Sequence, residues 1–414
     1  MPHPSRLGSP DDYAKMAISL LENSHVNGET IRLDGAIRLP PPLTFGFRGR
    51  TELSGAKEQR VLISQTIPNN HKVKALLQPW QEGLGGEQIG EVAALADRLG
   101  FSRLTVGEHF AIPKEYVELS GAHYVHAPTT LAYLAGRTSR IRLASNVSII
   151  PLQHPAVQAK QWAVLDWLSG GRADLMVGVG WLREEFELLG VDFRTRGRRL
   201  DEYIEAIRRI WTSELASYQG EFVQFDDIAA EPKPLQPGGV VPIWFAGDVP
   251  ATLARVARWG AGWSPYLTPP EQIAQKVDQI RQHPSYRGQP VGVFYNLANL
   301  RLSEGHKSKD DDHDFDTWNV QQLVDQLCWI RDLGVTEVTP PLPRLASYQQ
   351  FLERMHWLAE EVMPQVGLLR VPDRDQRPGA RVPGCPARRP APAAIGCEPW
   401  QITVSRPSRR WSPR

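Results

Sequence analysis

The sequence is poor in cysteine, carries almost no net charge and has no long apolar run. Its three cysteines, Cys328, Cys385 and Cys397, lack the spacing of metal ligands, so we expect no metal centre and a reducing compartment. The formal net charge of +1 gives no electrostatic reason to expect a nucleic-acid partner. No apolar run approaches the roughly 18–20 residues of a membrane span, and the N-terminus lacks the charged-then-apolar order of a secretion signal. We therefore expect a soluble, cytoplasmic protein with no membrane partner.

The C-terminal end differs in composition from the middle of the chain. From about Pro372 the sequence is rich in proline and arginine and shows no apolar period. Such a segment cannot bury enough apolar surface to offset the entropy lost on ordering. Residues 367–414 are therefore predicted to form a disordered tail.

Near the N-terminus, residues 5–41 read RLGSPDDYAKMAISLLENSHVNGETIRLDGAIRLPPP. This segment resembles the last helix and strand of a short-chain dehydrogenase. The glycine-rich nucleotide turn and the Tyr-x-x-x-Lys pair of that family have no counterpart before it. We interpret residues 1–41 as a dehydrogenase-like C-terminal fragment without activity, and residues 42–71 as a linker.

From residue 72 the sequence alternates between short apolar runs and amphipathic segments. Apolar residues recur at helical spacing over 89–99, 200–211 and 320–330. Seven or eight strand-helix units over roughly 290 residues are typical of a (β/α)8 barrel or a doubly wound sheet. The number of units favours a TIM-like α/β barrel over residues 72–366, with an insertion near 194–234 that contains a hairpin at YQGEFVQF. The expected strands are KVKALLQ (72–78), SRLTVGEH (102–109), IRLASNVSII (141–150), RADLMVGVG (172–180), VPIWFAG (241–247), AGWSPY (261–266) and VTEVTPP (335–341).

Functional side chains of a parallel barrel gather where the strands end at their C-terminal side. Glu108 and His109 follow the second expected strand, and a carboxylate beside a histidine can exchange protons near neutral pH. A surface turn that carries both residues by chance would give the same pattern. After the third strand, Asn146 and Val147 mark only a polar break in an apolar run.

Two glycine-containing turns follow later strands. The turn 178–180 would let backbone N–H groups approach an anion, although tight packing explains its glycines equally well. The loop 246–249 precedes Pro250, a favourable first helical residue, and so forms a second candidate anion site. Asp248 argues against phosphate there because its charge would repel the ligand. The residues of the two turns are Gly178, Val179, Gly180, Ala246, Gly247, Asp248 and Val249.

Three longer stretches carry a family resemblance. They are LADRLGFSRLTVGEHFAIP (95–113), the segment 127–212 that begins APTTLAYLAGRTSRIRLASNVSII, and EPKPLQPGGVVPIWFAGDVPATLARVARWGAGW (231–263). They are similar to the luciferase-like monooxygenases, most closely the branch of deazaflavin (coenzyme F-420)-dependent oxidoreductases. The resemblance covers nearly all of residues 72–366, and residues 168–211 are its most specific part.

The resemblance implies a TIM-like barrel that binds a flavin or deazaflavin at its C-terminal face. Family members carry an acidic-His pair after the second strand, which Glu108 and His109 match, so His109 is the expected proton donor or acceptor. Many members have a non-proline cis peptide after the third strand, and this falls on Asn146-Val147. The segments 178–180 and 246–249 match those that hold the cofactor phosphate and tail, with Asp248 in place of the usual small residue.

The resemblance also implies the chemistry. The expected reaction is hydride transfer between coenzyme F-420 and a small organic substrate. One alternative is a monooxygenase that uses reduced FMN and O2. A second alternative is a non-catalytic flavin binder or an inactive fusion product. A flavin or F-420 reductase is an expected partner, and a homodimer is the expected assembly.

Overall fold

The computed structural model describes residues 61–302 and 318–366, except residues 70, 72, 74 and 75, and the backbone of 58–59 and 369–370. The chain divides after residue 55, and every described residue belongs to the second unit. The dehydrogenase-like segment 1–41 lies outside the described residues. So does the predicted tail, apart from the short strand β14 (Leu369–Arg370), which pairs antiparallel with β1 (Glu58–Gln59).

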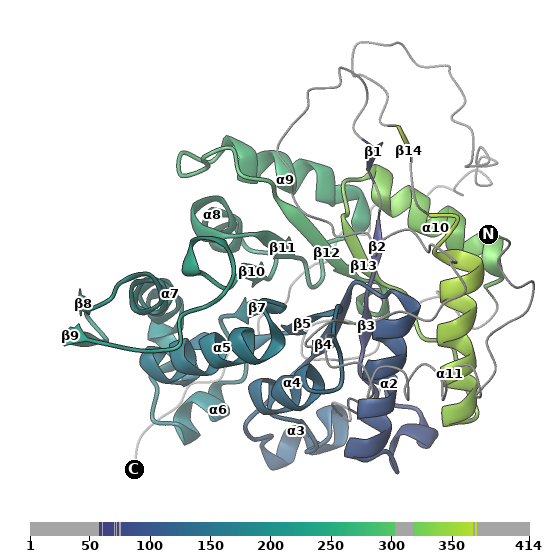
Figure 1. Ribbon diagram of the computed structural model, residues 1–414, viewed down its shortest axis with the longest axis horizontal. Helices are drawn as coiled ribbons and strands as arrows, with labels where there is room; N and C mark the ends of the chain where they lie inside the picture. Colours follow the sequence, from purple (N-terminus) through teal and green to yellow (C-terminus); the bar gives the residue numbers. More distant parts are fainter. Residues whose placement is uncertain are drawn as a thin grey trace, which may run out of the picture. The chain divides into compact units, whose positions relative to one another are not determined.

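A parallel sheet forms the centre of the molecule (Figure 1). In the described residues its strands follow the order β2-β13-β12-β11-β10-β7-β5-β4-β3, and β6 also pairs with β7. Only Ser64 separates β2 from β3, and β2 pairs with β13 while β3 pairs with β4. Both ends of the order therefore meet in one segment, and the sheet is a closed barrel, as the sequence predicts. The strands are β2 (Leu62–Ile63), β3 (Gln65–Thr66), β4 (Arg103–Val106), β5 (Arg142–Ser145), β6 (Ser148–Ile149), β7 (Ala173–Gly178), β10 (Ile243–Ala246), β11 (Gly262–Ser264), β12 (Gly292–Asn296) and β13 (Glu337–Thr339).

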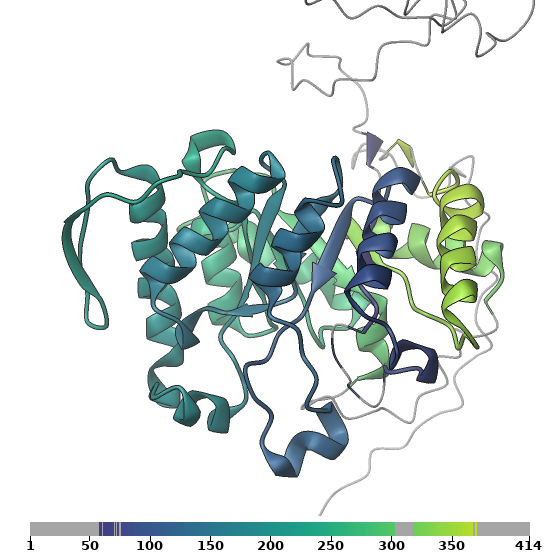
Figure 2. The same cartoon turned by 60° about the horizontal axis from the view of Figure 1, so that its bottom comes forward.

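Amphipathic helices cover the outside of the barrel (Figure 2). They bury their apolar stripes against the outward faces of the strands in one large core. Within the described residues, no helix combines the length and the apolar character that crossing a membrane requires. The predicted hairpin is present as β8 (Ala216–Gln219) and β9 (Gln224–Ile228). The helices are α2 (Gly86–Leu99), α3 (Lys114–Ser120), α4 (Ala127–Ala135), α5 (Pro155–Ser169), α6 (Arg183–Leu188), α7 (Arg196–Thr212), α8 (Pro250–Trp259), α9 (Ile273–Gln282), α10 (Val320–Asp332) and α11 (Tyr348–Trp357).

The first barrel strand is not where we expected it. The segment 72–78 is no strand in its described residues, because the N–H groups of Leu76 and Leu77 turn back to the carbonyl of Val73. The strand lies at 62–66, inside the expected linker 42–71. Its inward face is polar: the Ser64 hydroxyl lies 2.8 Å from that of Thr339. A strand with a polar inward face has no continuous apolar run, so the search for such runs missed it.

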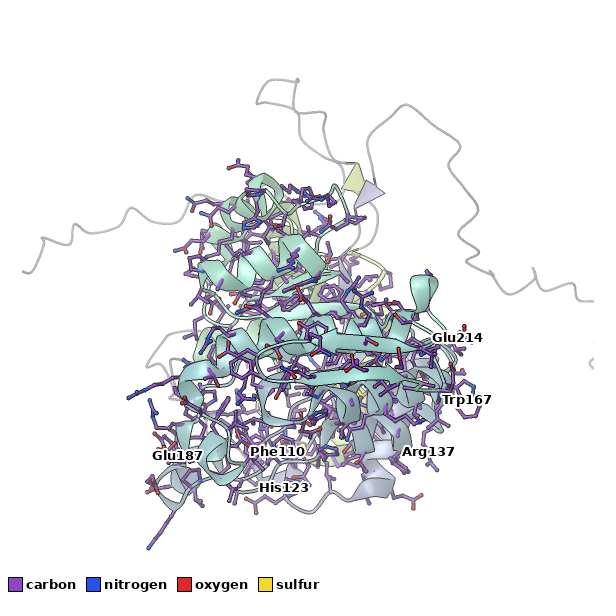
Figure 3. All side chains as sticks on the ribbon, turned by 90° about the vertical axis from the view of Figure 1, so that its left-hand side faces the viewer. Phe110, His123, Arg137, Trp167, Glu187 and Glu214 are labelled. Atoms are coloured by element: carbon purple, nitrogen blue, oxygen red, sulfur yellow. The ribbon has the colours of Figure 1, made fainter. Side chains whose placement is uncertain are left out.

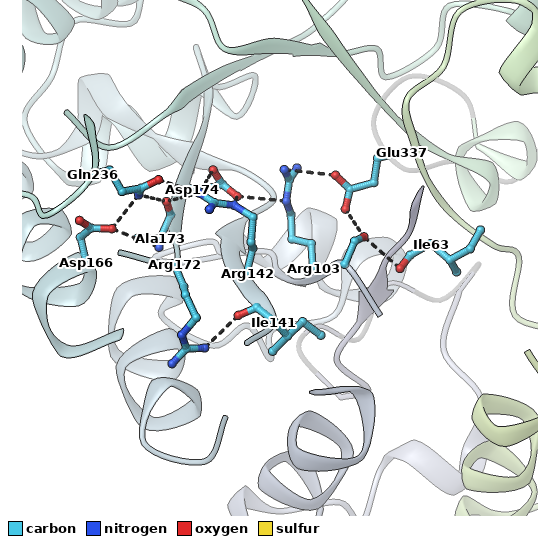
Figure 4. Close-up of polar contacts among 11 residues, drawn as sticks. Ile63, Arg103, Ile141, Arg142, Asp166, Arg172, Ala173, Asp174, Gln236 and Glu337 are labelled. Carbon is cyan, nitrogen blue, oxygen red and sulfur yellow. Dashed lines mark hydrogen bonds and ion pairs between the residues drawn. The ribbon is translucent and has the colours of Figure 1, made fainter. Parts of the chain in front are cut away.

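The interior of the barrel is layered. At the N-terminal end of the strands, Arg103 lies 3.2 Å from Asp174 and 3.1 Å from Glu337, and Arg142 bonds Asp174 at 2.5 Å (Figure 4). Two guanidinium groups thus face two carboxylates, which balances the charge buried there. An apolar layer of Ala144, Met176, Trp244 and Phe294 follows along the barrel axis. This charged layer lies at the end of the barrel opposite to the C-terminal ends of the strands, where parallel barrels bind their ligands.

Candidate active site

His109 lies just beyond the end of β4 and is bound by a glutamate from α6. The imidazole Nδ1 is 3.1 Å from Oε2 of Glu185, and their side chains are only 9% and 2% exposed. Oε1 of Glu185 accepts the N–H of Phe110 at 2.5 Å and that of Ala111 at 3.4 Å. One carboxylate therefore fixes both the histidine ring and the backbone that follows it.

Sequence reasoning did not single out Glu185. It lies in the stretch WLREEFELLG, where it reads as one of several charges on an exposed helix. A signal was present, because Glu185 directly precedes the apolar Phe186 and falls in the first turn of α6. That position places it on the buried side of the helix, where both residues are buried.

Aromatic side chains surround His109. Its ring meets the ring of Tyr124 edge-on with centroids 4.7 Å apart, and that of Trp181 at 6.0 Å. Tyr116 extends this group through Trp181, with centroids 5.7 Å apart. Burial raises the pKa of the Tyr124 hydroxyl, so this group stays protonated across the physiological range. The histidine ring is therefore largely buried, beside two aromatic rings and the carboxylate of Glu185.

The labelled side chains of Figure 3 place this site on the molecule. Glu187 lies at the lower left of this view and Phe110 and His123 low and near its middle, whereas Trp167 and Glu214 lie at its right-hand edge. Phe110 directly follows His109, and Glu187 lies on the same short helix as Glu185. The site is therefore formed by loops that leave the C-terminal ends of β4 and β7.

Glu108 has different partners from its neighbour. It is buried, and its Oε2 accepts the N–H of Ala127, the first residue of α4, at 2.9 Å. Burial raises the pKa of Glu108 to about 7, and the charge of Glu185 adds to this, while the Ala127 N–H and His109 act against it. Glu108 thus ties the end of β4 to the start of α4 and titrates near neutral pH. Its catalytic role stays a prediction.

The segment after β5 contains the expected non-proline cis peptide, between Asn146 and Val147. The N–H of Asn146 donates to the carbonyl of Val106 at 2.6 Å, which holds the segment beside the end of β4. The half-buried side chain of Val147 packs on the apolar layer of the barrel interior. Val147 therefore lies beside the interior of the barrel at its C-terminal end.

The turn 178–180 owes its glycines to close packing. A Cβ on Gly178 would lie 2.7 Å from Cγ2 of Val147. A Cβ on Gly180 would lie 2.7 Å from the ring of Phe186, and Gly180 has a φ of 81° that side chains disfavour. Packing thus accounts for both glycines. A role of Gly178, Val179 and Gly180 in holding a cofactor stays a prediction.

The loop 246–249 precedes α8 as expected, but the Asp248 side chain is already bound. Its carboxylate accepts the N–H groups of Tyr266, Leu267 and Thr268 at 2.9–3.1 Å, and the hydroxyl of Thr268 at 2.6 Å. These donors offset the negative charge, which weakens the expected repulsion of phosphate. Lys276 adds a positive charge, because its Nζ donates to the carbonyl of Asp248 at 3.0 Å.

Comparison with known proteins identifies the family. The sequence model of the luciferase-like monooxygenase family matches residues 74–360. An uncharacterized protein of Mycobacterium tuberculosis is 34% identical over 271 residues, which cover 61% of this chain and 86% of that protein. An FMNH2-dependent dimethylsulfone monooxygenase of Pseudomonas putida is 30% identical over 213 residues, covering 50% of this chain and 56% of that protein.

A solved structure agrees in fold. The F-420-dependent tetrahydromethanopterin reductase of Methanopyrus kandleri has a TM-score of 0.56 and 16% identity, covering 75% of this chain and 100% of that chain. At this identity the likeness concerns the fold alone. With the match of the family model and the relatives in sequence, it leads to one conclusion: the chain belongs to the luciferase-like monooxygenase family.

Proposed function

We propose that the protein transfers hydride between coenzyme F-420 and a small organic substrate, and that His109 donates or accepts the accompanying proton. The observation that carries this proposal is the buried pair of His109 and Glu185 at the C-terminal end of the barrel. Family membership supports a redox role, and the position fits the place where parallel barrels carry their chemistry.

The residues at this end suit a cofactor with a flat ring and a phosphate. Val147 and the partly exposed Trp181 offer apolar surface for the ring. The start of α8, the loop 246–249 and Lys276 offer backbone N–H groups and a positive charge for the phosphate. The turn 178–180 would hold the neighbouring part of the cofactor. A bound deazaflavin would supply hydride-transfer chemistry.

The protein's own groups would manage the proton. An imidazole changes its charge near neutral pH, and the aromatic rings around His109 limit exchange with water. Glu108, with a pKa of about 7, is a second group that can hold or release a proton under these conditions. The hydrogen bond of the Glu108 carboxylate goes to the N–H of Ala127. We therefore propose that Glu108 acts on His109 electrostatically, through its negative charge.

A second candidate function is a monooxygenase that uses reduced FMN and O2. Two relatives favour it: the Pseudomonas putida enzyme and a flavin-dependent trigonelline monooxygenase of Acinetobacter baylyi, which is 32% identical over 218 residues. The matched F-420-dependent structures are 14% and 16% identical. In this case a separate flavin reductase would supply the reduced FMN.

Titration of the purified protein with oxidised F-420 and with oxidised FMN, followed by fluorescence quenching, tests the proposal. Tight binding of F-420 alone supports hydride transfer and directs the search to small alcohols and ketones as substrates. Preference for FMN supports the monooxygenase. Binding of neither contradicts both and favours the inactive fusion product. Sedimentation equilibrium of the same sample tests the proposed homodimer.

A further inference from the structure

The carboxylate of Glu185 contacts one of the two ring nitrogens of His109, Nδ1. We infer that Glu185 is a positioning residue that keeps a proton on Nδ1 of His109, so that proton exchange with the substrate uses Nε2. The catalytic consequence rests on the proposed function, whereas the placement of the proton on the ring does not.

The direction of the hydrogen bond follows from the partners of Glu185. Its Oε1 accepts the backbone N–H groups of Phe110 and Ala111, and such donors stabilise a carboxylate in its ionised form. An ionised carboxylate has no proton to give, so the 3.1 Å contact requires Nδ1–H to be the donor. A free imidazole can carry its proton on either nitrogen. The contact with Glu185 therefore selects the tautomer with the proton on Nδ1.

The charges around the ring support the same assignment. Within the described residues, no lysine or arginine forms an ion pair with Glu185, and the imidazole of His109 is the side chain that its Oε2 contacts. In the described part of the chain, Glu108 on the same loop and Tyr124, whose pKa is raised by burial, are further titratable groups near His109. With both side chains nearly inaccessible to water, the attraction between His109 and Glu185 is stronger than at a surface.

The geometry determines how a proton would move. When a carbonyl carbon of the substrate takes up hydride from a reduced deazaflavin, Nε2–H of the protonated imidazole would give its proton to the carbonyl oxygen, which gains negative charge. The ring becomes neutral and keeps Nδ1–H on Glu185. In the opposite direction Nε2 takes the proton from the substrate, and Glu185 stabilises the resulting positive charge. Glu185 itself stays ionised in both directions.

The hydrogen bonds of Glu185 to Phe110 and Ala111 could also serve only to hold the backbone in place. The test must therefore measure the protonation of the His109 ring itself. Glu185→Gln preserves an oxygen for these backbone N–H groups, but it presents an amide N–H to Nδ1. The variant should therefore move the proton of the neutral ring from Nδ1 to Nε2. Glu187→Gln is the matched control, because it removes the same charge from an exposed position on the same helix.

The measurement is long-range 1H–15N NMR of the full chain labelled at histidine, with the His109 signals assigned by their loss in His109→Asn. We expect an Nδ1–H tautomer in the native protein and in Glu187→Gln, and an Nε2–H tautomer in Glu185→Gln. With a substrate found by screening alcohols and ketones with F-420, turnover of Glu185→Gln should fall about 10-fold to 100-fold. The dissociation constant of oxidised F-420 should change less than about twofold in the same variant. The reason is that Glu185 contacts His109 and the backbone after it, and not the residues proposed to hold the cofactor.

An Nε2–H tautomer in the native protein, or an unchanged tautomer in Glu185→Gln, overturns the inference. If Glu185→Gln does not fold, the native tautomer and that of Glu185→Asp, which retains the charge and should retain Nδ1–H, decide the question. If the tautomer changes as expected but His109→Asn turns over at the native rate, the positioning stands and the proposed function fails.

Discussion

The free energy of unfolding should depend on pH through Glu108. Its carboxyl is only 8% exposed, and burial raises its pKa from 4.5 to about 7. Below pH 4.5 both the folded and the unfolded chain hold this proton. Between pH 4.5 and 7 the unfolded chain loses it first, so the folded state becomes less stable as the pH rises. At about 1.4 kcal/mol per pH unit, the full loss above pH 7 is about 3 kcal/mol.

Glu108→Gln isolates this effect. The amide is neutral at every pH, and its oxygen can still accept the N–H of Ala127. We expect the variant and the native protein to have similar stability at pH 4.5. At pH 8.5 the variant should be more stable by about 3 kcal/mol, since it avoids a buried charge.

Urea unfolding followed by tryptophan fluorescence, at several pH values from 4.5 to 8.5, measures this difference. The difference between two proteins cancels the titration of all other groups, which both share. Glu187→Gln, at an exposed position, should show no comparable change with pH. A difference between Glu108→Gln and the native protein that stays constant over this range would refute the reasoning, because Glu108 would then have the same pKa folded and unfolded.

Four further predictions follow from the structure. His109→Ala should lower turnover about 100-fold or more while F-420 binding by fluorescence stays within about twofold; equal turnover would exclude proton transfer by His109. Arg103→Met should cost about 3–5 kcal/mol in urea unfolding, since it leaves two buried carboxylates short of a partner, and a loss below about 1 kcal/mol would contradict this. Gly180→Ala should cost about 1–3 kcal/mol because its Cβ meets Phe186, as thermal unfolding can check against the exposed Gly86→Ala. Asp248→Ala should weaken binding of FMN or F-420 about tenfold by releasing the loop after β11; tighter binding would mean that its charge repels the phosphate.

Local sequence patterns determined most of the barrel. Helical spacing predicted α2, α7 and α10, and apolar runs predicted the barrel strands β4, β5, β7, β10, β11 and β13, whereas β12 was not predicted. These patterns suffice because each element buries one face against its neighbours. The spacing of the apolar residues along the sequence shows which face that is. The rule that chemistry follows the C-terminal ends of strands also selected His109 before its surroundings were known.

Only the tertiary structure decided which groups meet. Glu185 is 76 positions from His109 along the chain, and no periodic pattern links two residues at that separation. The same holds for the first strand, whose inward Ser64 meets Thr339 across the closure of the barrel. From the sequence, an anion site and tight packing explained the glycines of the turn 178–180 equally well, and only the structure shows that a Cβ there would meet Val147 or Phe186. Periodicity encodes which side of an element is buried, but the identity of the partner depends on how the strands close around the axis.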